Sequence, residues 1–134
     1  KPLVVGGLAL EYYGIRPNGE DFDYIVSPND WNNLRTHYKD NINLVRGKTE
    51  KEVDLTINIV VDDKKVDLIS SLYQFNYDEL IKDSLEHDFY RVISIEKILF
   101  IKTLAAVNND IKSIKDQKLI VDFIVDSKYQ PVNR

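Results

Sequence analysis

Two features near the start of the chain constrain its fold more than any others. An apolar segment, Leu3–Val5, ends at Gly6-Gly7, and Asp21-Phe22-Asp23 opens a second apolar segment. Side chains alternate along a strand, so both carboxylates point to the same face, where they repel each other unless a cation lies between them. A glycine pair at a strand-to-helix turn lets the backbone approach a phosphate closely. This run predicts a strand, a short helix and an acidic strand that together hold a metal–nucleotide complex.

The rest of the chain predicts a mixed fold of strands and helices. Alternating apolar residues predict strands, and an apolar spacing of three to four residues predicts helices. The strands are expected at Phe22–Val26, Ile42–Val45, Val53–Val61, Lys65–Ser70 and Phe89–Ile93. The helices are expected at Leu8–Tyr13, from Pro28 to about Tyr38, after the capping box Asn76–Glu79, at Ile95–Asn108 and at Ile111–Val125.

These elements predict an α/β (α+β) fold with a mixed sheet flanked by helices and a C-terminal helical pair. The 134 residues form one predicted domain, residues 1–134, with a sheet-containing core at about 1–93 and a helical part at about 94–126. The chain begins directly before an apolar strand and contains no methionine, so we expect the natural protein to have residues upstream of Lys1.

Composition excludes several classes of site. The chain has no cysteine, which removes disulfides, zinc–thiolate sites and cysteine nucleophiles, and it has only two histidines. The net charge of −4 argues against non-specific nucleic-acid binding as the main activity. No apolar run reaches the roughly 18 residues of a membrane helix, so no membrane partner is expected.

A phosphoryl-transfer site usually needs a third carboxylate besides Asp21 and Asp23. Asp54 and Asp67 both lie between apolar residues. In the predicted hairpin, which turns at Asp62-Asp63, Asp67 lies mid-strand opposite Asn58 or Ile59, whereas Asp54 lies at the open end and is better explained as a surface carboxylate. We therefore expect Asp67 to complete the site.

A lysine and an aspartate occupy apolar positions on the two C-terminal helices. On a helical projection, Lys102 falls among Ile95, Ile98 and Ala105, and Asp116 falls among Leu119, Ile120 and Phe123. Lysine is rarely buried without an anionic partner, although it can extend its amine to solvent. The pattern predicts a polar site shared by Lys102 and Asp116. Asp122 groups with Lys115 and Lys118 on the polar face, where Lys118–Asp122 is an ordinary i,i+4 pair.

The order Gly-Gly, short helix, arginine, Asp-x-Asp and a later strand aspartate resembles the nucleotidyltransferase superfamily of the DNA polymerase β type. The C-terminal segment RVISIEKILFIKTLAAVNNDIKSIKDQKLIVDFI is similar to that of minimal nucleotidyltransferases, including the AbiEii-type toxins of toxin–antitoxin systems. In those proteins a helix with a central lysine precedes a helix with a Lys-Asp pair, here Lys102 and Lys115-Asp116. A second register of this resemblance places Asp122 at the position of the family's aspartate. The resemblance covers nearly the whole chain.

The resemblance implies roles for the remaining site residues. Gly6 and Gly7 would hold the triphosphate of an NTP such as ATP, with Arg16, Lys102 and Asp116 also on the nucleotide. The catalytic residues would be Asp21, Asp23, Asp67 and Lys102, and the three aspartates would bind Mg²⁺, or Mn²⁺ in its place. The loop after Arg16 departs from the family pattern, because it reads Asn18-Gly19-Glu20 where a serine or threonine is common and is one residue longer.

Several partners follow from this resemblance. The acceptor of the nucleotide would be an RNA 3′ end, a small-molecule hydroxyl or a protein side chain, in the cytoplasm. The small size of the chain implies that acceptor recognition needs a further segment, a homodimer or a protein partner. The alternative is a non-catalytic nucleotidyltransferase-like binding module or a toxin–antitoxin component.

Overall fold

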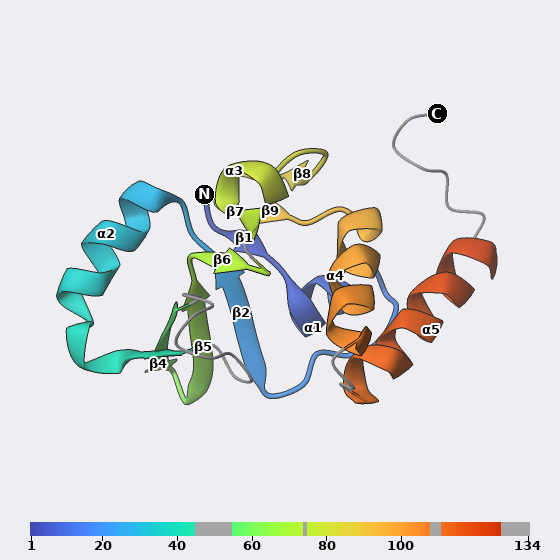
Figure 1. The fold of residues 1–134 in the computed structure, drawn as a ribbon, viewed down its shortest axis with the longest axis horizontal. Helices are drawn as coiled ribbons and strands as arrows, with labels where there is room; N and C mark the ends of the chain where they lie inside the picture. The colour runs from blue at the N-terminus through green and yellow to red at the C-terminus, as the bar shows by residue number, and fades with distance from the viewer. Residues whose placement is uncertain (45–54, 74, 108–110, 127–134) are drawn as a thin grey trace.

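The protein folds into one mixed sheet with helices on both of its faces (Figure 1). The structure, a computed structural model, describes residues 1–44, 55–73, 75–107 and 111–126. In chain order the elements are β1 (Leu3–Val4), α1 (Gly6–Tyr12), β2 (Asp21–Ile25), α2 (Pro28–His37), the 3₁₀ turn η1 (Lys39–Asn41), β3 (Ile42–Leu44), β4 (Leu55–Val61), β5 (Lys64–Ile69), β6 (Ser71–Leu72), β7 (Phe75–Asn76), α3 (Tyr77–Leu80), β8 (Leu85–Glu86), β9 (Arg91–Val92), α4 (Ile95–Val107) and α5 (Ile111–Asp126). The predicted class, a mixed α/β sheet flanked by helices with a C-terminal helical pair, is confirmed.

The main sheet contains seven strands in the order β3-β4-β5-β2-β1-β9-β8, and β6 and β7 pair separately. Strand β2 lies at its centre, parallel to β5 and antiparallel to β1. Strand β1 is parallel to β9, and the pairs β3–β4, β4–β5 and β8–β9 are antiparallel. The first strand of the chain, β1, and the last strand that the structure describes, β9, are therefore neighbours in one sheet.

The β4–β5 hairpin forms as predicted and turns at Asp62-Asp63. Both residues have positive φ, 50° and 65°, as a two-residue type I′ turn requires, and aspartate tolerates this conformation better than most residues. The turn fixes the register, which pairs Asn58 with Asp67 as expected. The predicted strand residues 45 and 53–54, the predicted surface carboxylate Asp54 and the predicted helix end at residue 108 lie outside the described residues.

The predicted caps are present at α2 and α3. Ser27 accepts a hydrogen bond from the backbone N–H of Asp30, with Pro28 at the first helical position. At α3, the Asn76 side chain accepts from the backbone N–H of Glu79, and the Glu79 carboxylate accepts in return from the N–H of Asn76.

Several elements differ from the sequence-based expectation, and the short elements η1, β6 and β7 were not expected at all. Helix α1 begins at Gly6 rather than Leu8, because the backbone turns at Gly6 with φ +61°. Strand β8 was not expected, because two residues are too few to show an alternating pattern; it pairs with β9, where Leu85 lies opposite Val92.

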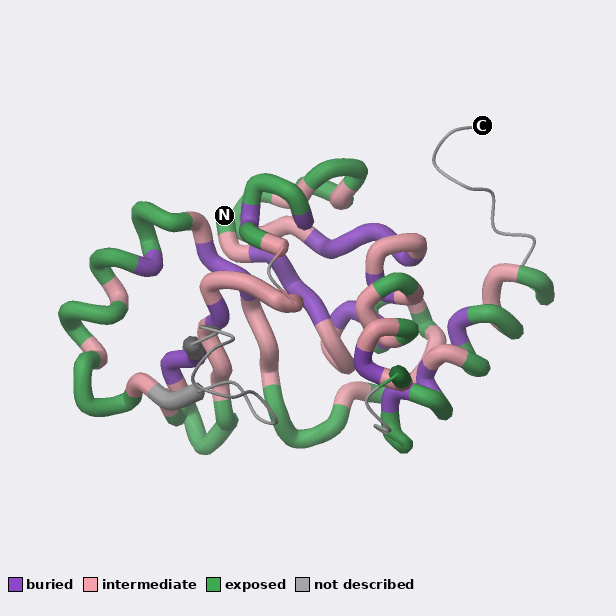
Figure 2. Tube along the Cα trace, in the orientation of Figure 1, coloured by how far each residue is buried: buried purple, intermediate pink, exposed green. Residues whose placement is uncertain are grey.

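One buried cluster joins the strands to the C-terminal helices. Leu3 of β1, Leu10 of α1, Ile95 of α4 and Ile120 of α5 all belong to it and are fully buried or nearly so. Figure 2 shows buried positions along the central strands and exposed positions along the outer sides of α2 and α5. The sheet and the helical pair thus share a hydrophobic core.

A second buried cluster covers the face of the β4–β5 hairpin that is turned away from Asp67. Trp31 of α2 packs with Val26 and Ile57, and Leu68 packs against them. Ile57 and Leu68 alternate with Asn58 and Asp67 along their strands. Helix α2 therefore occupies one face, and the aspartates of β2 and β5 point to the other. In the described ranges, no helix is long and apolar enough to cross a membrane.

Candidate active site

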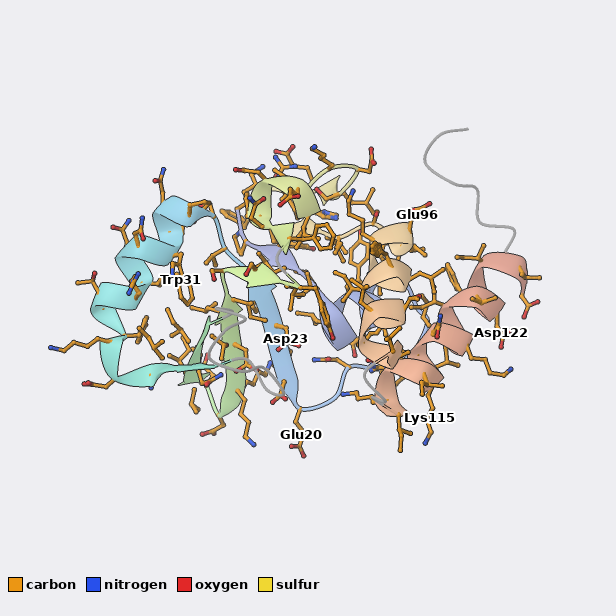
Figure 3. The ribbon with its side chains drawn as sticks, in the orientation of Figure 1. Glu20, Asp23, Trp31, Glu96, Lys115 and Asp122 are labelled. Atoms are coloured by element: carbon orange, nitrogen blue, oxygen red, sulfur yellow. The ribbon has the colours of Figure 1, made fainter. Side chains whose placement is uncertain are left out.

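The register of the central strands brings two of the predicted aspartates side by side. Asp23 of β2 is paired with Asp67 of β5, and Asn58 of β4 is paired with Asp67 from the other side. Paired residues point to the same face, so these three side chains form a row across the sheet. Asp21 lies two residues before Asp23 on the same face, at the exposed start of β2. In Figure 3, Asp23 lies on β2 between the hairpin and α4.

The carboxyl groups of Asp23 and Asp67 lie close enough to interact directly, and this interaction affects the pKa of Asp23. The pKa of Asp23 rises from 3.8 to about 6, and the largest cause is the burial of the side chain. The negative charge of Asp67, a hydrogen bond with Asp67 and the negative charge of Asp21 raise this pKa further, whereas the positive charge of Lys102 lowers it. Asn58 also donates a hydrogen bond of 2.6 Å from Nδ2 to Oδ1 of Asp67. The acidic row therefore carries more negative charge than the neighbouring Lys102 neutralises.

Gly6 lies directly against Asp23. A Cβ atom at Gly6 would stand 2.9 Å from Oδ2 of Asp23, closer than real Cβ contacts, and the positive φ also disfavours other residues. At Gly7, a Cβ atom would meet Oδ1 of Asn18 at 2.5 Å and Nη1 of Arg16 at 3.3 Å. The glycine pair therefore lets the loop at 16–18 and the acidic strand pack closely around the start of α1.

Asp116 joins two cations from distant parts of the chain. Its Oδ1 accepts from Nε of Arg16 at 2.6 Å, and its Oδ2 accepts from Nη2 of Arg16 at 2.8 Å and from Nζ of Lys102 at 3.0 Å. The Asp116 side chain is only 3% exposed, against 17% for Arg16 and 14% for Lys102. Burial alone would raise the pKa of Asp116, but the hydrogen bonds from Arg16 and Lys102 outweigh it and lower this pKa. The predicted pairing of Lys102 with Asp116 is present, and their role at a nucleotide stays a prediction.

The alternative aspartate, Asp122, lies elsewhere. Its Oδ2 is 3.3 Å from Nζ of Lys118, the predicted i,i+4 pair, and both side chains are exposed. Figure 3 shows Asp122 on the outer part of α5, away from Asp23. Of the two aspartates that the sequence left open, Asp116 is the one that contacts Lys102.

A partly open cavity of about 190 Å³ connects the acidic row to Lys102. Its polar wall contains Asp23, Lys102 and the buried Ser113, and Gly6 contributes backbone. Its remaining wall is mostly apolar: Val5, Ile69, Leu72, Tyr73, Ile93, Ile98, Ile101 and Ala105. A cavity lined by both charged and apolar groups suits a ligand that carries both a charged and an apolar part.

A larger hollow of about 630 Å³ lies on the other face of the sheet. It is lined by Val4 and Tyr24, which alternate with the residues of the acidic face, and by Tyr12, Phe89 and Tyr90. None of the predicted site residues lines it, so the smaller cavity is the candidate active site.

The carboxylates fit Mg²⁺ better than any softer metal, because all their ligand atoms are oxygens. Within the ranges described above, no three histidine, aspartate or glutamate residues stand close enough to form a ready metal cluster. Mg²⁺ characteristically binds through one or two carboxylates together with water and substrate phosphates. The paired Asp23 and Asp67, with Asp21 exposed beside them, match that smaller donor set.

Two contacts of the site were not predicted. Asn58 was expected opposite Asp67 but not as its hydrogen-bond donor, although a polar residue amid Ile57 and Ile59 was a signal for it. Arg16 was expected on the nucleotide, and the structure instead places its guanidinium on Asp116; its contact with a nucleotide stays a prediction. No protein-family model, curated protein or solved structure matches the chain, so the resemblance to nucleotidyltransferases also stays a prediction.

Proposed function

We propose that the protein is a Mg²⁺-dependent nucleotidyltransferase that moves an NMP from an NTP to an acceptor hydroxyl and releases pyrophosphate. The observation that carries the proposal is the row of Asp23 and Asp67 next to a cavity that Lys102 also lines. Burial first, and the neighbouring Asp67 second, raise the pKa of Asp23 to about 6. Two carboxylates held this close favour a cation between them. Perturbed acidic groups in a cleft are typical of functional sites.

The reaction balances without any redox partner. The acceptor oxygen forms a bond to the α-phosphorus while the bond from that phosphorus to the β-bridging oxygen breaks, and pyrophosphate leaves. Asp23 and Asp67 would hold Mg²⁺, and the exposed Asp21 would add negative charge beside them. The ion would neutralise phosphate charge and orient the phosphates. Asp67 would also accept the proton of the attacking hydroxyl, and Asn58 keeps its carboxylate turned toward Asp23.

Lys102 would supply positive charge to the triphosphate. Its amine lies 3.0 Å from Asp116, which also binds Arg16, so one buried carboxylate fixes two cations near the cavity. Fixed charges in a partly buried site stabilise developing negative charge without reorganisation. Arg16 binds both oxygens of Asp116, and Lys102 shares one of them, so Arg16 would add its charge to the same field.

The apolar residues that line the cavity would contact the nucleoside. At about 190 Å³ the cavity is smaller than a typical site for a whole drug-sized ligand, so the phosphates would lie outside it, along Asp23 and Gly6. Tyr73 and Ile101 line the wall against which a base would pack. The acceptor would be an RNA 3′ end, a small-molecule hydroxyl or a protein side chain, and the cytoplasm would be the compartment that supplies it.

Incubation with each α-labelled NTP, Mg²⁺ and separate pools of RNA, protein and aminoglycoside-type acceptors tests the proposal. We expect label to reach one pool with wild type and to fall at least about 100-fold with the double variant Asp21→Ala and Asp23→Ala. Transfer that survives the double variant rejects the site.

A binding measurement separates this proposal from a non-catalytic module. Mg²⁺ with NTP should raise the melting temperature of wild type and leave that of the double variant unchanged. The matched control is Asp122→Ala, an exposed aspartate away from the site, which should respond like wild type. Nucleotide binding without transfer to any pool would favour the non-catalytic module.

A further inference from the structure

Helix α5 carries an exposed apolar stripe on the side that faces away from the protein. Ile111, Ile114, Val121 and Val125 are 69%, 48%, 43% and 69% exposed. Together with Lys118, these four residues are separated by three, four, three and four positions in the sequence. This spacing places all five side chains on one line along the helix. A stripe with this spacing is the seam by which one helix packs against another.

The stripe is separate from the face that α5 buries in its own protein. Ser113, Asp116 and Ile120 are buried, and on a helical wheel they lie far round the helix from the exposed line. Figure 2 shows exposed positions along the outer side of this helix. An amphipathic helix needs only one apolar face to dock on its own core, so the second apolar line is unexplained by this fold.

The exposed charges of α5 are sorted along its length. Lys112, Lys115 and Lys118 lie in the first half, and Asp122 and Asp126 lie in the second half. This order is unfavourable for an isolated helix, because the N-terminus of a helix favours acidic groups and the C-terminus favours basic groups. A neighbouring helix that ran in the opposite direction would place its acidic end beside the basic half of α5.

We propose that α5 pairs with α5 of a second copy of this chain, antiparallel, around a twofold axis near Lys118. The apolar line is self-complementary in this arrangement, since Ile111 and Ile114 of one copy meet Val121 and Val125 of the other. Each basic half meets an acidic half, and only Lys118 faces its own copy at the axis, where its contact with Asp122 offsets its charge. A parallel pair would bring every charge beside its like. Figure 3 shows Lys115 and Asp122, which flank the line, on the outer side of the helix.

The pairing is a weak one on its own. The helix has 16 residues, about 24 Å, so a single helix pair falls in the small class of transient interfaces. We expect a dissociation constant on the order of 1–100 μM, measurable by sedimentation over that range. Because Asp116 lies on the inner side of the same helix, the dimer would hold in place the element that carries it.

Sedimentation of the whole chain tests the surface. Wild type should form a dimer, and Ile114→Glu with Val121→Glu should raise the dissociation constant at least tenfold while leaving the melting temperature nearly unchanged. The matched control is Val60→Glu, an apolar residue on β4 that is 70% exposed. A wild type that stays monomeric to about 500 μM, or a dimer that the α5 variant leaves intact, overturns the proposal.

Cysteine cross-linking tests the direction, because the chain has no cysteine of its own. Ile111→Cys mixed with Val125→Cys, two positions that lie opposite each other about an axis at Lys118, should form a mixed disulfide on mild oxidation, and each variant alone should stay uncross-linked. In the antiparallel pair, two copies of the same position, 111 or 125, would be about 21 Å apart along the helix axis, and a disulfide needs Cα atoms within about 7 Å. Cross-linking of each variant with itself would indicate a parallel pair and contradict the antiparallel arrangement.

Discussion

Replacing Asp23 by asparagine should stabilise the protein at neutral pH while it removes the proposed activity. The pKa of Asp23 is about 6 in the folded chain and 3.8 as an ordinary carboxyl. A raised pKa of this kind stabilises the fold below pH 3.8, and that contribution is lost as the pH rises through 6. At about 1.4 kcal/mol for each pKa unit, ionised Asp23 costs up to about 3 kcal/mol at pH 7.5.

Asparagine has no charge to bury and can still donate a hydrogen bond to Asp67. We therefore expect Asp23→Asn to raise the free energy of unfolding by about 1–3 kcal/mol at pH 7.5, or the melting temperature by roughly 3–9 °C. At pH 4.5, where most of the ionisation cost is absent, the gain should fall to about one third. Urea denaturation at both pH values, in a chelator, measures both numbers.

The control is Asp21→Asn, on the same strand and face but exposed, which should change stability by less than about 0.5 kcal/mol. A gain for Asp23→Asn that is absent at pH 7.5, or equal at the two pH values, would refute the reasoning. It would mean that the Asp23 side chain is not held as a buried, negatively surrounded carboxyl.

Three further changes should have defined effects. Gly6→Ala places a Cβ 2.9 Å from Oδ2 of Asp23 at a positive φ, so we expect a loss of about 1–3 kcal/mol in thermal unfolding and weaker NTP binding by calorimetry. Asp116→Asn leaves two partly buried cations without their counter-charge and should lower the free energy of unfolding by about 3–5 kcal/mol, measured in urea. Because the pKa of Asp116 is lowered in the folded protein, the difference from wild type should shrink as the pH falls below 3.8. Asn58→Ala removes the hydrogen-bond donor to Asp67, so it should lower kcat more than it changes KM and lower the free energy of unfolding by about 1 kcal/mol. Equal effects on kcat and KM would contradict the role of Asn58 in orienting Asp67.

The row of acidic residues could largely be predicted from the sequence. Alternation fixes which residues of a strand share a face, and the Asp62-Asp63 turn fixes the hairpin register, so Asp67 opposite Asn58 followed from local rules. That β2 would lie beside β5, and so place Asp23 beside Asp67, was a hypothesis from the chemistry of paired carboxylates. The pairing Asp23–Asp67 in the structure agrees with it.

The hydrogen bonds of Arg16 could not be predicted in the same way. Arg16 and Asp116 are 100 residues apart, and their contact depends on how α5 packs against the loop before β2. The apolar surroundings of Asp116 on a helical projection indicated burial, and therefore a partner, but they could not distinguish one cation from two. Strand β8 was missed for a simpler reason, since a two-residue strand has no period.

Label position in the transferred group tests the central claim most directly. The protein is incubated with Mg²⁺ and an acceptor pool, once with α-labelled and once with γ-labelled NTP. We predict that the α label becomes attached to the acceptor and that the γ label is released in pyrophosphate. The Asp23→Asn variant should remain folded but should neither label the acceptor nor release pyrophosphate. Attachment of the γ label would instead identify a kinase, and transfer that Asp23→Asn does not reduce would contradict the assignment of the active site.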